Sequence, residues 1–375
     1  MGCASLAAVA AESAGAFATG SYRNLFREYL GKSNPEIDAK LAAAWNQLFR
    51  GDENSQRLFY PIASDMAYVP DVANNDVRTE GLSYGLMICV QTDHRREFNQ
   101  LWKFAKHYMG HEAGPLRGYF TWHTALNGNK LRDTGPAPDG EEWFVTALFF
   151  AAHRWGSGVQ GESADGEGIF NYEAEAQSLL HTMLHKDDET GRGNEGNMID
   201  REAKQINFVP QGPGATYTNP SYHLPAFYEL WARWAASPED RATLAQLAPT
   251  SRDLFKKVAH PQTGLMPDIC GFDGKPARVG RDEFRYDAWR TLSNSALDYA
   301  WWAADSWETA QANRVLTFLA SQGPDCPDRF KLDGTPISAD VNSPGLFAMA
   351  ASAALAADRK IGEPFVRHLW EMKIP

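Results

Sequence analysis

The sequence predicts an all-α protein, an α/α barrel in which an inner ring of helices is wrapped by an outer ring. Helical patterns dominate the 375 residues, and helices that are apolar on nearly every face alternate with helices that carry charge on one side. The competing doubly wound α/β fold would need Val- and Ile-rich strands between its helices. Only residues 206–209 resemble such a strand, so the alternation of helices favours the barrel.

Each predicted helix follows from its own pattern. Residues 34–49 are amphipathic, and Ser33 or Asn34 is placed to cap their first turn. The nearly uniformly apolar segments, expected in the inner ring, are residues 79–92, 141–155, 287–304 and 344–357. The segments with one charged side, expected in the outer ring, are residues 97–109, 172–185 and 241–259. Residues 221–236 and 308–321 are two further helices.

The connections predict one domain with functional loops. No linker divides the chain, so residues 1–375 are expected to form a single catalytic domain, with residues 1–20 a leader remnant or disordered. Three connections rich in Gly and Pro are longer than ordinary loops: residues 110–140, 191–220 and 260–285. Loops of this length usually carry function.

Composition excludes several classes of function. The net charge of −11 argues against a nucleic-acid partner, because phosphate contacts need clustered Lys and Arg. No stretch approaches the ~20 apolar residues of a membrane span. The cysteines lack metal-site spacing, which argues against zinc and against a disulfide framework; they are Cys3, Cys89, Cys270 and Cys326. The 12 Trp, 13 Tyr and 20 Phe favour a binding groove with half-exposed rings.

Acidic residues open several of the inner helices. Glu80, Asp139 and Asp287 each stand at the start of an apolar run, which suggests one cleft lined by carboxylates. Asp76 is placed to cap the first of these helices and leave Glu80 one turn inside. Gly81 follows Glu80 directly, and small residues beside a costly acid suggest a backbone kept close to a ligand.

Structural interpretations of the same acids stay open. Asp139 could simply cap its helix, with Glu142 three residues later closing a capping box. Asp287 could form an Asp–Arg ion pair at a helix start, or it could be a base held ionised by an arginine. His223 is expected to be a satisfied core histidine rather than a catalyst.

Aromatic loops near the acids favour carbohydrate as the substrate. The run 119–123 holds three rings, and Trp143 and Tyr286 lie near acids in the sequence. Sugars stack their C–H faces on such rings, and paired carboxylates suit glycoside hydrolysis, where one acid protonates the leaving oxygen and another drives water. The chain has no phosphate-binding Gly-rich loop after a strand, no His-Glu-x-x-His and no Gly-x-Ser-x-Gly.

Four motifs resemble glycoside hydrolase family 8, and within it the reducing-end xylose-releasing exo-oligoxylanases. They are Asp-Val-Arg-Thr-Glu-Gly-Leu-Ser-Tyr-Gly from Asp76, Ala-Pro-Asp-Gly-Glu-Glu-Trp-Phe from Ala137, Asn-Pro-Ser-Tyr-His-Leu-Pro-Ala-Phe-Tyr-Glu-Leu from Asn219, and Phe-Arg-Tyr-Asp-Ala-Trp-Arg from Phe284. The resemblance runs from about residue 25 to residue 370.

The resemblance implies an (α/α)6 barrel that hydrolyses β-1,4 links with inversion and needs no metal or cofactor. Glu80 would be the general acid, Asp287 the general base, and Asp139 would hold the distorted sugar. The acid must be protonated near neutral pH, which burial would favour. An inverting enzyme leaves room for water, so the Glu80 and Asp287 carboxyls are expected to lie ~6.5–9.5 Å apart.

The resemblance also implies a set of residues that bind the xylo-oligosaccharide. Tyr222 would help to place the attacking water and Trp122 would be a stacking platform. The remaining residues expected to bind substrate are Arg78, Trp143, Tyr286, Arg290 and Asn342.

Two departures from the family pattern keep alternatives open. Asn342 stands where the exo-acting members carry His, so an endo-acting xylanase, endoglucanase or chitosanase of the same family is the first alternative. Relatives also continue for about one helix beyond Pro375, which suggests a truncated C-terminus. An alternative of another class is an oligosaccharide-binding protein without turnover. A cytoplasmic location is favoured, with secretion or a periplasmic location as the alternatives.

Overall fold

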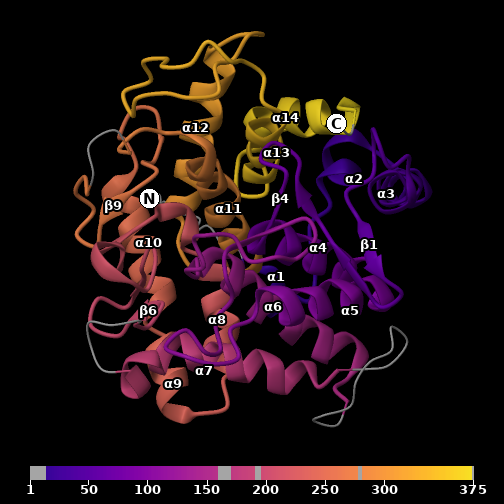
Figure 1. Cartoon of the computed structure of the whole chain (residues 1–375). Helices are drawn as coiled ribbons and strands as arrows, with labels where there is room; N and C mark the ends of the chain where they lie inside the picture. The colour runs from indigo at the N-terminus through magenta and orange to yellow at the C-terminus, as the bar shows by residue number, and fades with distance from the viewer. Residues whose placement is uncertain (1–13, 159–169, 191–195, 278–280, 374–375) are drawn as a thin grey trace, which may run out of the picture.

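The computed structural model describes residues 14–158, 170–190, 196–277 and 281–373. Residues 1–13, which contain Cys3 and most of the expected leader remnant, lie outside the described residues. The described chain is mainly helical, and its helices surround a common centre (Figure 1). None of its helices is long and apolar enough to cross a membrane.

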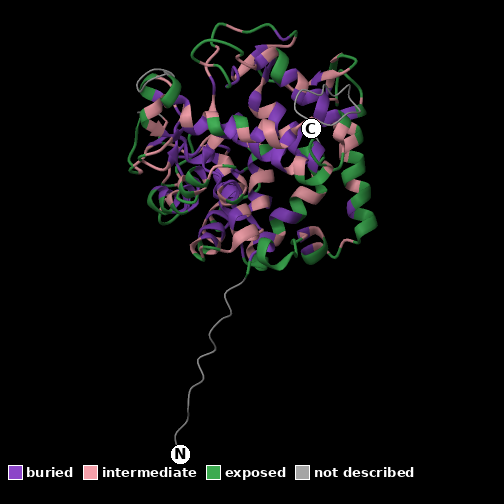
Figure 2. Cartoon of the chain, turned by 90° about the horizontal axis from the view of Figure 1, so that it is seen from below, coloured by how far each residue is buried: buried purple, intermediate pink, exposed green. Residues whose placement is uncertain are grey.

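The predicted α/α barrel is confirmed. The inner helices are α4 (Thr79–Gln91), α6 (Pro138–Trp155), α8 (Pro225–Trp234), α11 (Arg290–Trp302) and α13 (Pro344–Ala353). Outer helices that pack against them are α5 (Arg95–Phe104), α7 (Tyr172–Thr190), α10 (Leu247–Val258), α12 (Trp307–Ser321) and α14 (Arg359–Glu371). Buried residues concentrate where the two rings meet (Figure 2).

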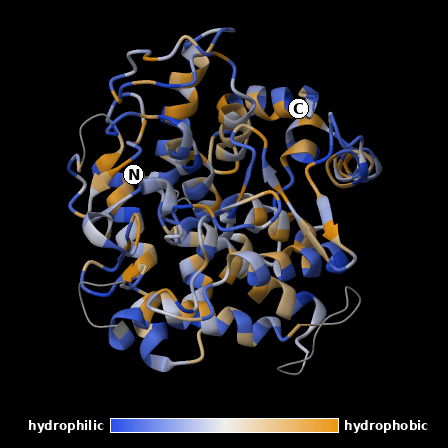
Figure 3. Cartoon of the chain, viewed as in Figure 1, coloured by the Kyte–Doolittle hydropathy of each residue, from blue (hydrophilic) through white to orange (hydrophobic). Residues whose placement is uncertain are grey.

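Large apolar side chains hold the two rings together. Trp102 of α5 packs edge-on against Phe144 of α6, and both are almost fully buried. Trp231 of α8 donates its indole N–H to the Thr146 hydroxyl at 3.1 Å, so a polar edge inside this core is satisfied. Hydrophobic and hydrophilic residues alternate along the outer helices (Figure 3), and most of their large hydrophobic residues are buried.

Prolines break two helices that the sequence pattern joined. The expected helix 221–236 is a 3-10 turn, η3 (Pro220–Tyr222), followed by α8, which begins at Pro225. The expected helix 241–259 is α9 (Pro238–Leu244) followed by α10, with Pro249 in the first turn of α10. A proline ring clashes with the carbonyl four residues earlier and lacks the N–H for a helical bond. The new helix therefore begins at the proline in α8 and two residues before it in α10.

Between residues 14 and 50, the structure describes three helices, of which one was predicted. The capping box that opens α3 (Asn34–Arg50) confirms Ser33 as its N-cap, with Glu36 as the reciprocal partner. The structure adds α1 (Ala16–Thr19) and α2 (Leu25–Leu30), so this part of the first thirty residues belongs to the barrel.

The short helix α1 packs against the C-terminal end of α11. Its Phe17 ring lies 4.3 Å from the ring of Trp302, the last residue of α11. Beside it lies a cavity of about 750 Å³. The aromatic rings that line this cavity include Phe150, Trp234 and Trp301, from the C-terminal ends of inner helices.

Short strands that the helical patterns did not predict join the loops. They are β1 (Tyr60–Ala63), β2 (Met66–Tyr68), β3 (Pro70–Asp71), β4 (Asp76–Arg78), β5 (His123–Ala125), β6 (Ile199–Asp200), β7 (Gln205–Ile206), β8 (Tyr217–Thr218) and β9 (Cys270–Gly271). Of the expected strand 206–209, only Ile206 lies in a strand, where it pairs with Ile199. In the sheet β3–β4–β5, Arg78 pairs with His123, and the Thr79 N–H donates to the Trp122 carbonyl at 3.0 Å. This sheet therefore fixes the start of α4.

Candidate active site

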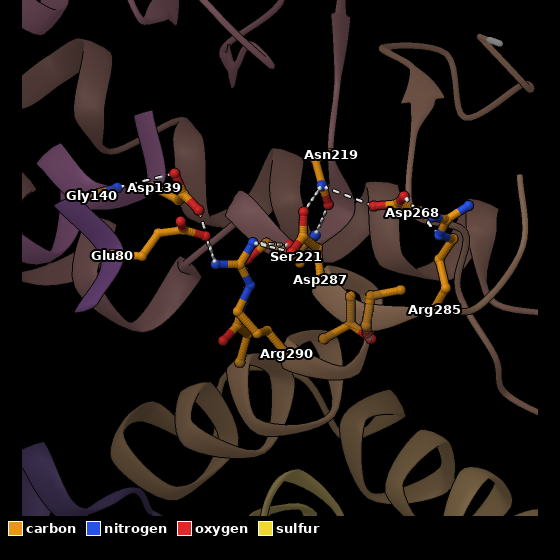
Figure 4. Close-up of polar contacts among 12 residues, drawn as sticks. Glu80, Asp139, Gly140, Asn219, Ser221, Asp268, Arg285, Asp287 and Arg290 are labelled. Carbon is orange, nitrogen blue, oxygen red and sulfur yellow. Dashed lines mark hydrogen bonds and ion pairs between the residues drawn. The ribbon is translucent and has the colours of Figure 1, made fainter. Parts of the chain in front are cut away.

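The three acids singled out in the sequence converge on one arginine. Arg290 Nη1 lies 2.9 Å from Asp139 Oδ2 and 3.3 Å from Glu80 Oε1. Its Nη2 lies 3.5 Å from Asp287 Oδ1. Figure 4 shows Glu80 and Asp139 on one side of the guanidinium and Asp287 on the other. A cation between three carboxylates offsets charge that would otherwise be costly to bring together.

The acids come from the N-terminal ends of inner helices. Glu80 is the second residue of α4 and Asp139 the second residue of α6, while Asp287 lies on the 3-10 turn η4 (Tyr286–Trp289) that leads into α11. The helices enter the barrel side by side, so their first turns meet at one end. The three carboxylates therefore lie together, as the sequence predicts, and their role in catalysis stays a prediction.

The predicted capping roles are wrong. Asp76 lies in β4, and the N-cap of α4 is Arg78, without a side-chain cap. The N-cap of α6 is Ala137, because Pro138 opens the helix and places Asp139 inside its first turn. Glu142 accepts instead from the Tyr228 hydroxyl at 2.5 Å, so it does not close a capping box.

Gly140 lets α6 approach α4. A Cβ atom at this position would lie 2.3 Å from Thr79 Oγ1 and 2.4 Å from Thr79 Cβ, which is closer than atoms can pack. Because Asp139 precedes Gly140 and Glu80 follows Thr79, this close contact is what brings the two carboxyl groups together. Gly81, by contrast, has ordinary space, with its nearest neighbour the Val69 carbonyl at 3.6 Å. It faces the protein's own backbone there, not a ligand as expected.

We expect Gly140→Ala to lower stability by about 1–3 kcal/mol, the usual cost of overpacking, and to lower kcat by separating Asp139 from Glu80. Thermal unfolding and hydrolysis assays on purified variants measure both effects. Gly81→Ala is the matched control for stability, because its added methyl has room. Equal melting temperatures for the two variants would contradict the packing argument.

Burial favours the protonated form of Asp139. The Asp139 side chain is only 4% exposed, against 28% for Glu80. Burial first, and the neighbouring Glu80 second, raise the pKa of the Asp139 carboxyl well above its usual range, although Arg290 opposes this rise. The Asp139 carboxyl therefore keeps its proton to a higher pH than an exposed aspartate does. From the sequence, burial was expected to favour the protonated form of Glu80. In the structure, Asp139 is the more deeply buried of the two acids.

The opposite side of the site is organised by Asn219. Its Nδ2 lies 3.5 Å from Asp287 Oδ2 and 3.3 Å from Asp268 Oδ1, and its Oδ1 accepts from the Ser221 N–H at 2.8 Å. Because the backbone N–H can only donate, this last contact fixes which end of the amide faces the carboxylates. Figure 4 shows Asn219 between the two aspartates.

Asp268 is a buried acid of this network. Its Oδ2 lies 2.6 Å from Arg281 Nε, and Arg285 Nε is 3.9 Å away. Burial, followed by the charge of Asp287, raises the pKa of Asp268 to about 6. The arginine that contacts Asp287 is thus Arg290, three residues later, while Arg285 is directed to Asp268 and Glu283.

Two expected substrate-binding residues lie beside this centre. Tyr222 is buried, with the Arg290 guanidinium 5.4 Å from its ring centre. Burial raises the pKa of Tyr222 well above its usual range, which keeps its hydroxyl neutral. Trp143 packs edge-on against Tyr84 and Phe227, so its ring forms part of the barrel wall.

The other expected substrate-binding residues lie on loops. Trp122 is half-buried, with His123 stacked on it at 3.7 Å and the Arg78 guanidinium 5.2 Å from its ring centre. Tyr286 is 47% exposed immediately before Asp287, and its backbone is in the left-handed region with φ of 34°. A left-handed non-glycine residue is uncommon and costs energy, so its surroundings hold it there.

Asn342 also adopts the left-handed conformation, with φ of 57°. Its N–H donates to the Cys326 carbonyl at 2.8 Å, and the residue is exposed. Asn tolerates this backbone region better than most residues. The loop's conformation is therefore a structural reason for Asn at this position, in addition to the sugar contact expected from the sequence.

Sequence reasoning missed four residues of the site. Tyr84 and Ser221 contact Arg290 at 3.0 Å each, and Asn219 and Asp268 form the network next to Asp287. Burial raises the pKa of Tyr84 to about 12. Tyr84, Asn219 and Ser221 lie inside the motifs quoted above, so their positions in those motifs could have indicated a role in the site. Asp268 lies outside them. His223, as expected, is a core residue, held by Thr218 and Ser251 at 2.8 Å each.

Comparisons with known proteins agree with this geometry. The family described as "Glycosyl hydrolases family 8" matches residues 62–199 and 208–363. The reducing-end xylose-releasing exo-oligoxylanase Rex8A of Paenibacillus barcinonensis is 41% identical over 95% of this chain and 90% of its own length. Its structure in complex with xylose superposes with a TM-score of 0.88, at 40% identity over 96% of this chain and 92% of that one.

A second solved structure is similar to the same degree. It is a catalytic mutant of a family 8 xylanase from Teredinibacter turnerae in complex with xylohexaose. Its TM-score is 0.88, at 42% identity over 96% of this chain and 93% of that one. Both structural neighbours confirm the (α/α)6 barrel expected for the described helices.

Proposed function

This chain belongs to glycoside hydrolase family 8, and on that premise we propose that it releases xylose from the reducing end of β-1,4-xylo-oligosaccharides with inversion. The observation that carries the proposal is the convergence of Glu80, Asp139 and Asp287 on Arg290. The similarity to Rex8A along nearly the whole chain supports the exo-oligoxylanase activity in particular.

In the proposed reaction, Glu80 and Asp287 divide the two proton transfers. Glu80 gives its proton to the oxygen of the leaving xylose as the C1–O bond breaks. Asp287 takes a proton from the water that attacks C1 from the opposite face, and the product keeps the new hydroxyl in the inverted configuration. Their nearest oxygens bind the two terminal nitrogens of one planar guanidinium, so they lie at most about 9 Å apart. This bound agrees with the spacing of inverting enzymes.

Asp139 is proposed to hold the sugar at the point of cleavage. Its carboxyl is buried beside Glu80, and Arg290 fixes one of its oxygens at 2.9 Å. The raised pKa of Asp139 favours its protonated form, which can donate a hydrogen bond to Glu80 or to a sugar hydroxyl without adding a second full negative charge. Trp122 is proposed to stack on the substrate, and Tyr222 is proposed to help place the attacking water.

The arrangement of charges explains why a metal is not needed in this proposal. Arg290 supplies a fixed cation between the acid and the base, and it can also orient both groups. As an arginine it remains charged at any pH at which the enzyme works, since the surrounding anionic groups raise its pKa further despite its burial.

An endo-acting xylanase is the second candidate. The similarity to the Teredinibacter turnerae xylanase favours it, and so does the exposed loop at Asn342, which has Asn where exo-acting relatives are expected to carry His. A barrier beyond the reducing-end xylose distinguishes the two activities, and Asn is shorter than His.

The proposed function is tested by a time course on xylotriose to xylohexaose labelled at the reducing end, and on polymeric xylan. Products are separated by length and anomer. We expect single labelled xylose from each oligomer, an inverted anomer and little attack on xylan. A range of oligomers from xylan would establish the endo activity instead. Binding of xylohexaose without any product would establish a non-catalytic binding protein.

We further propose that Asp268 positions the base through Asn219. The amide bridges both carboxylates, and the charge of Asp268 stabilises the proton that Asp287 takes from water. Asp268, with a pKa of about 6, is ionised above that pH and loses its charge below it. Its contribution to the rate is therefore present above pH 6 and is lost as the pH falls through 6.

We expect Asp268→Asn to lower kcat about tenfold at pH 7.5 with little change in KM, because the residue acts on the transition state and not on substrate binding. The wild-type kcat profile should show an inflection near pH 6 that the variant lacks. Asp273→Asn, an exposed change on the same loop, is the control. An inflection that persists in Asp268→Asn would contradict this role.

A further inference from the structure

A cluster of imidazole and carboxylate groups lies on the outer layer, on elements that carry none of the proposed catalytic residues. His181 and His185 are one turn apart on α7, and Asp240 is in the first turn of the neighbouring helix α9. One ligand atom from each residue can be chosen so that all lie within 4.8 Å of one another. Histidines at positions i and i+4 present their rings on the same face of a helix.

His185 contacts two aspartates, one through each of its ring nitrogens. Its Nδ1 lies 2.9 Å from Asp188 Oδ2, and an ionised carboxylate can only accept, so Nδ1 carries a proton. Its Nε2 lies 2.7 Å from Asp240 Oδ1. In the neutral ring, Nε2 is also an acceptor, so two lone pairs would face each other. Partial burial lowers the pKa of His185, but the hydrogen bonds to Asp240 and Asp188 outweigh this and raise the pKa above its usual value, so a second ring proton makes this contact. A metal ion held by both residues would bind in place of that proton.

The groups that orient the His185 ring are of the kind found behind metal-binding histidines. Such histidines usually donate the other ring N–H to a carboxylate, which fixes the tautomer and the ring orientation. Asp188 fills this role, and Arg201 holds it with two contacts, at 2.9 Å and 2.7 Å. The imidazole of His185 is therefore oriented before any ion arrives.

His181 gives the cluster a third possible metal ligand, which a hydrogen bond between His185 and Asp240 would not require. Its Nδ1 lies 3.9 Å from Asp240 Oδ2, on the oxygen that His185 does not contact. Its ring lies 4.5 Å from the ring of His185 with an angle of 26° between the planes. The side chain of His181 is 63% exposed and that of Asp240 is 11% exposed, so the cluster is anchored on one side and open to water on the other.

We propose that His181, His185 and Asp240 bind a divalent transition-metal ion of the zinc type, which joins α7 to α9. Two imidazoles and one carboxylate suit Zn²⁺ and do not suit Mg²⁺ or Ca²⁺, which prefer oxygen ligands. Water would complete the tetrahedral shell on the open side. Because the cluster joins two outer helices, the ion's effect is on stability.

The test is titration calorimetry of the full chain, stripped of metal with a chelator, with ZnCl2 and separately with MgCl2 at pH 7.5. We expect one zinc ion per chain and no saturable binding of magnesium. His181→Ala should weaken zinc binding at least about tenfold, and Asp188→Asn about 10–100-fold through its effect on His185. His368→Ala, an exposed histidine on α14, is the matched control and should bind zinc as the wild type does.

A second readout follows the stability of the same variants. Zinc should raise the melting temperature of the wild type and of His368→Ala, and should leave His181→Ala unchanged. His181→Ala removes an exposed ring, so it is expected to fold. Equal zinc affinity in His181→Ala and wild type, no saturable zinc binding, or equal binding of magnesium would each overturn the proposal. Binding is measured without substrate, so this outcome is independent of the hydrolytic activity.

Discussion

Glu80→Gln should lower kcat on xylotriose by about 10²–10⁴-fold, the range that general acid catalysis contributes. Glutamine keeps the shape of the side chain and can still contact Arg290 through its carbonyl, so substrate binding and KM should change little. It has no proton to give to the leaving xylose. The measurement is steady-state kinetics with xylotriose under conditions in which the variant is shown to be folded.

A substrate with a better leaving group separates the acid from the base. Fluoride leaves without protonation, so β-xylobiosyl fluoride should restore most of the rate of Glu80→Gln. Asp287→Asn should lose activity on both substrates, because water must still be deprotonated when fluoride leaves. If Glu80→Gln were as slow on the fluoride as on xylotriose, or retained full activity on xylotriose, Glu80 would not be the acid.

Arg290→Met should have the largest effect on the molecule as a whole. It leaves three carboxylates without the cation between them, and breaking a buried ion pair from one side costs about 3–5 kcal/mol. Hydrolysis should fall below detection, because Glu80 and Asp287 lose their common anchor. Chemical denaturation at several pH values measures the loss of stability.

The pH dependence of this loss has a definite sign. The pKa of Asp139 is raised in the folded chain, so the folded state binds its proton more tightly than the unfolded state, and stability is lost as the pH rises through the folded value. Arg290 opposes that rise. Its removal should therefore cost more at pH 8 than at pH 5.

Arg290→Lys is the matched control for this variant. Lysine keeps the charge but is a point cation without the planar fork, so it cannot hold groups on two nitrogens at once. We expect it to recover much of the stability and little of the activity. Full recovery of activity would show that only the charge of Arg290 matters and would contradict its orienting role.

The carboxylate cluster could be predicted from the sequence, and the groups that hold it could not. Glu80, Asp139 and Asp287 stand at the starts of apolar helices, and residue type together with position was enough to bring them to one end of a barrel. Asp268 is separated from Asn219 by 49 positions and lies on a loop. Neither helical periodicity nor a local motif predicts that such a loop will return to the site.

The helices were predicted well where packing and pattern agree, and less well where one proline decides. The inner helices are buried as expected, because segments that are apolar on nearly every face are stable only in the core. Pro225 and Pro249 each lie inside a pattern that reads as one continuous helix, and each divides that helix in two. The helix α14 was not predicted, because it contains Pro364 in its interior. Its packing against α13 and α2 outweighs the helix-breaking effect of that proline. The β3–β4–β5 sheet was missed because strands of two or three residues have no readable period.

The helix α1 has a practical consequence for attaching the protein to a solid support. Its Phe17 sits on Trp302, at the last turn of α11, while Arg290 forms the first residue of the same helix. At 1.5 Å per residue the two ends of α11 are about 18 Å apart along its axis. A tether fixed just ahead of α1 would therefore hold the barrel by the end opposite the carboxylates, which would face the bulk solution and dissolved chains.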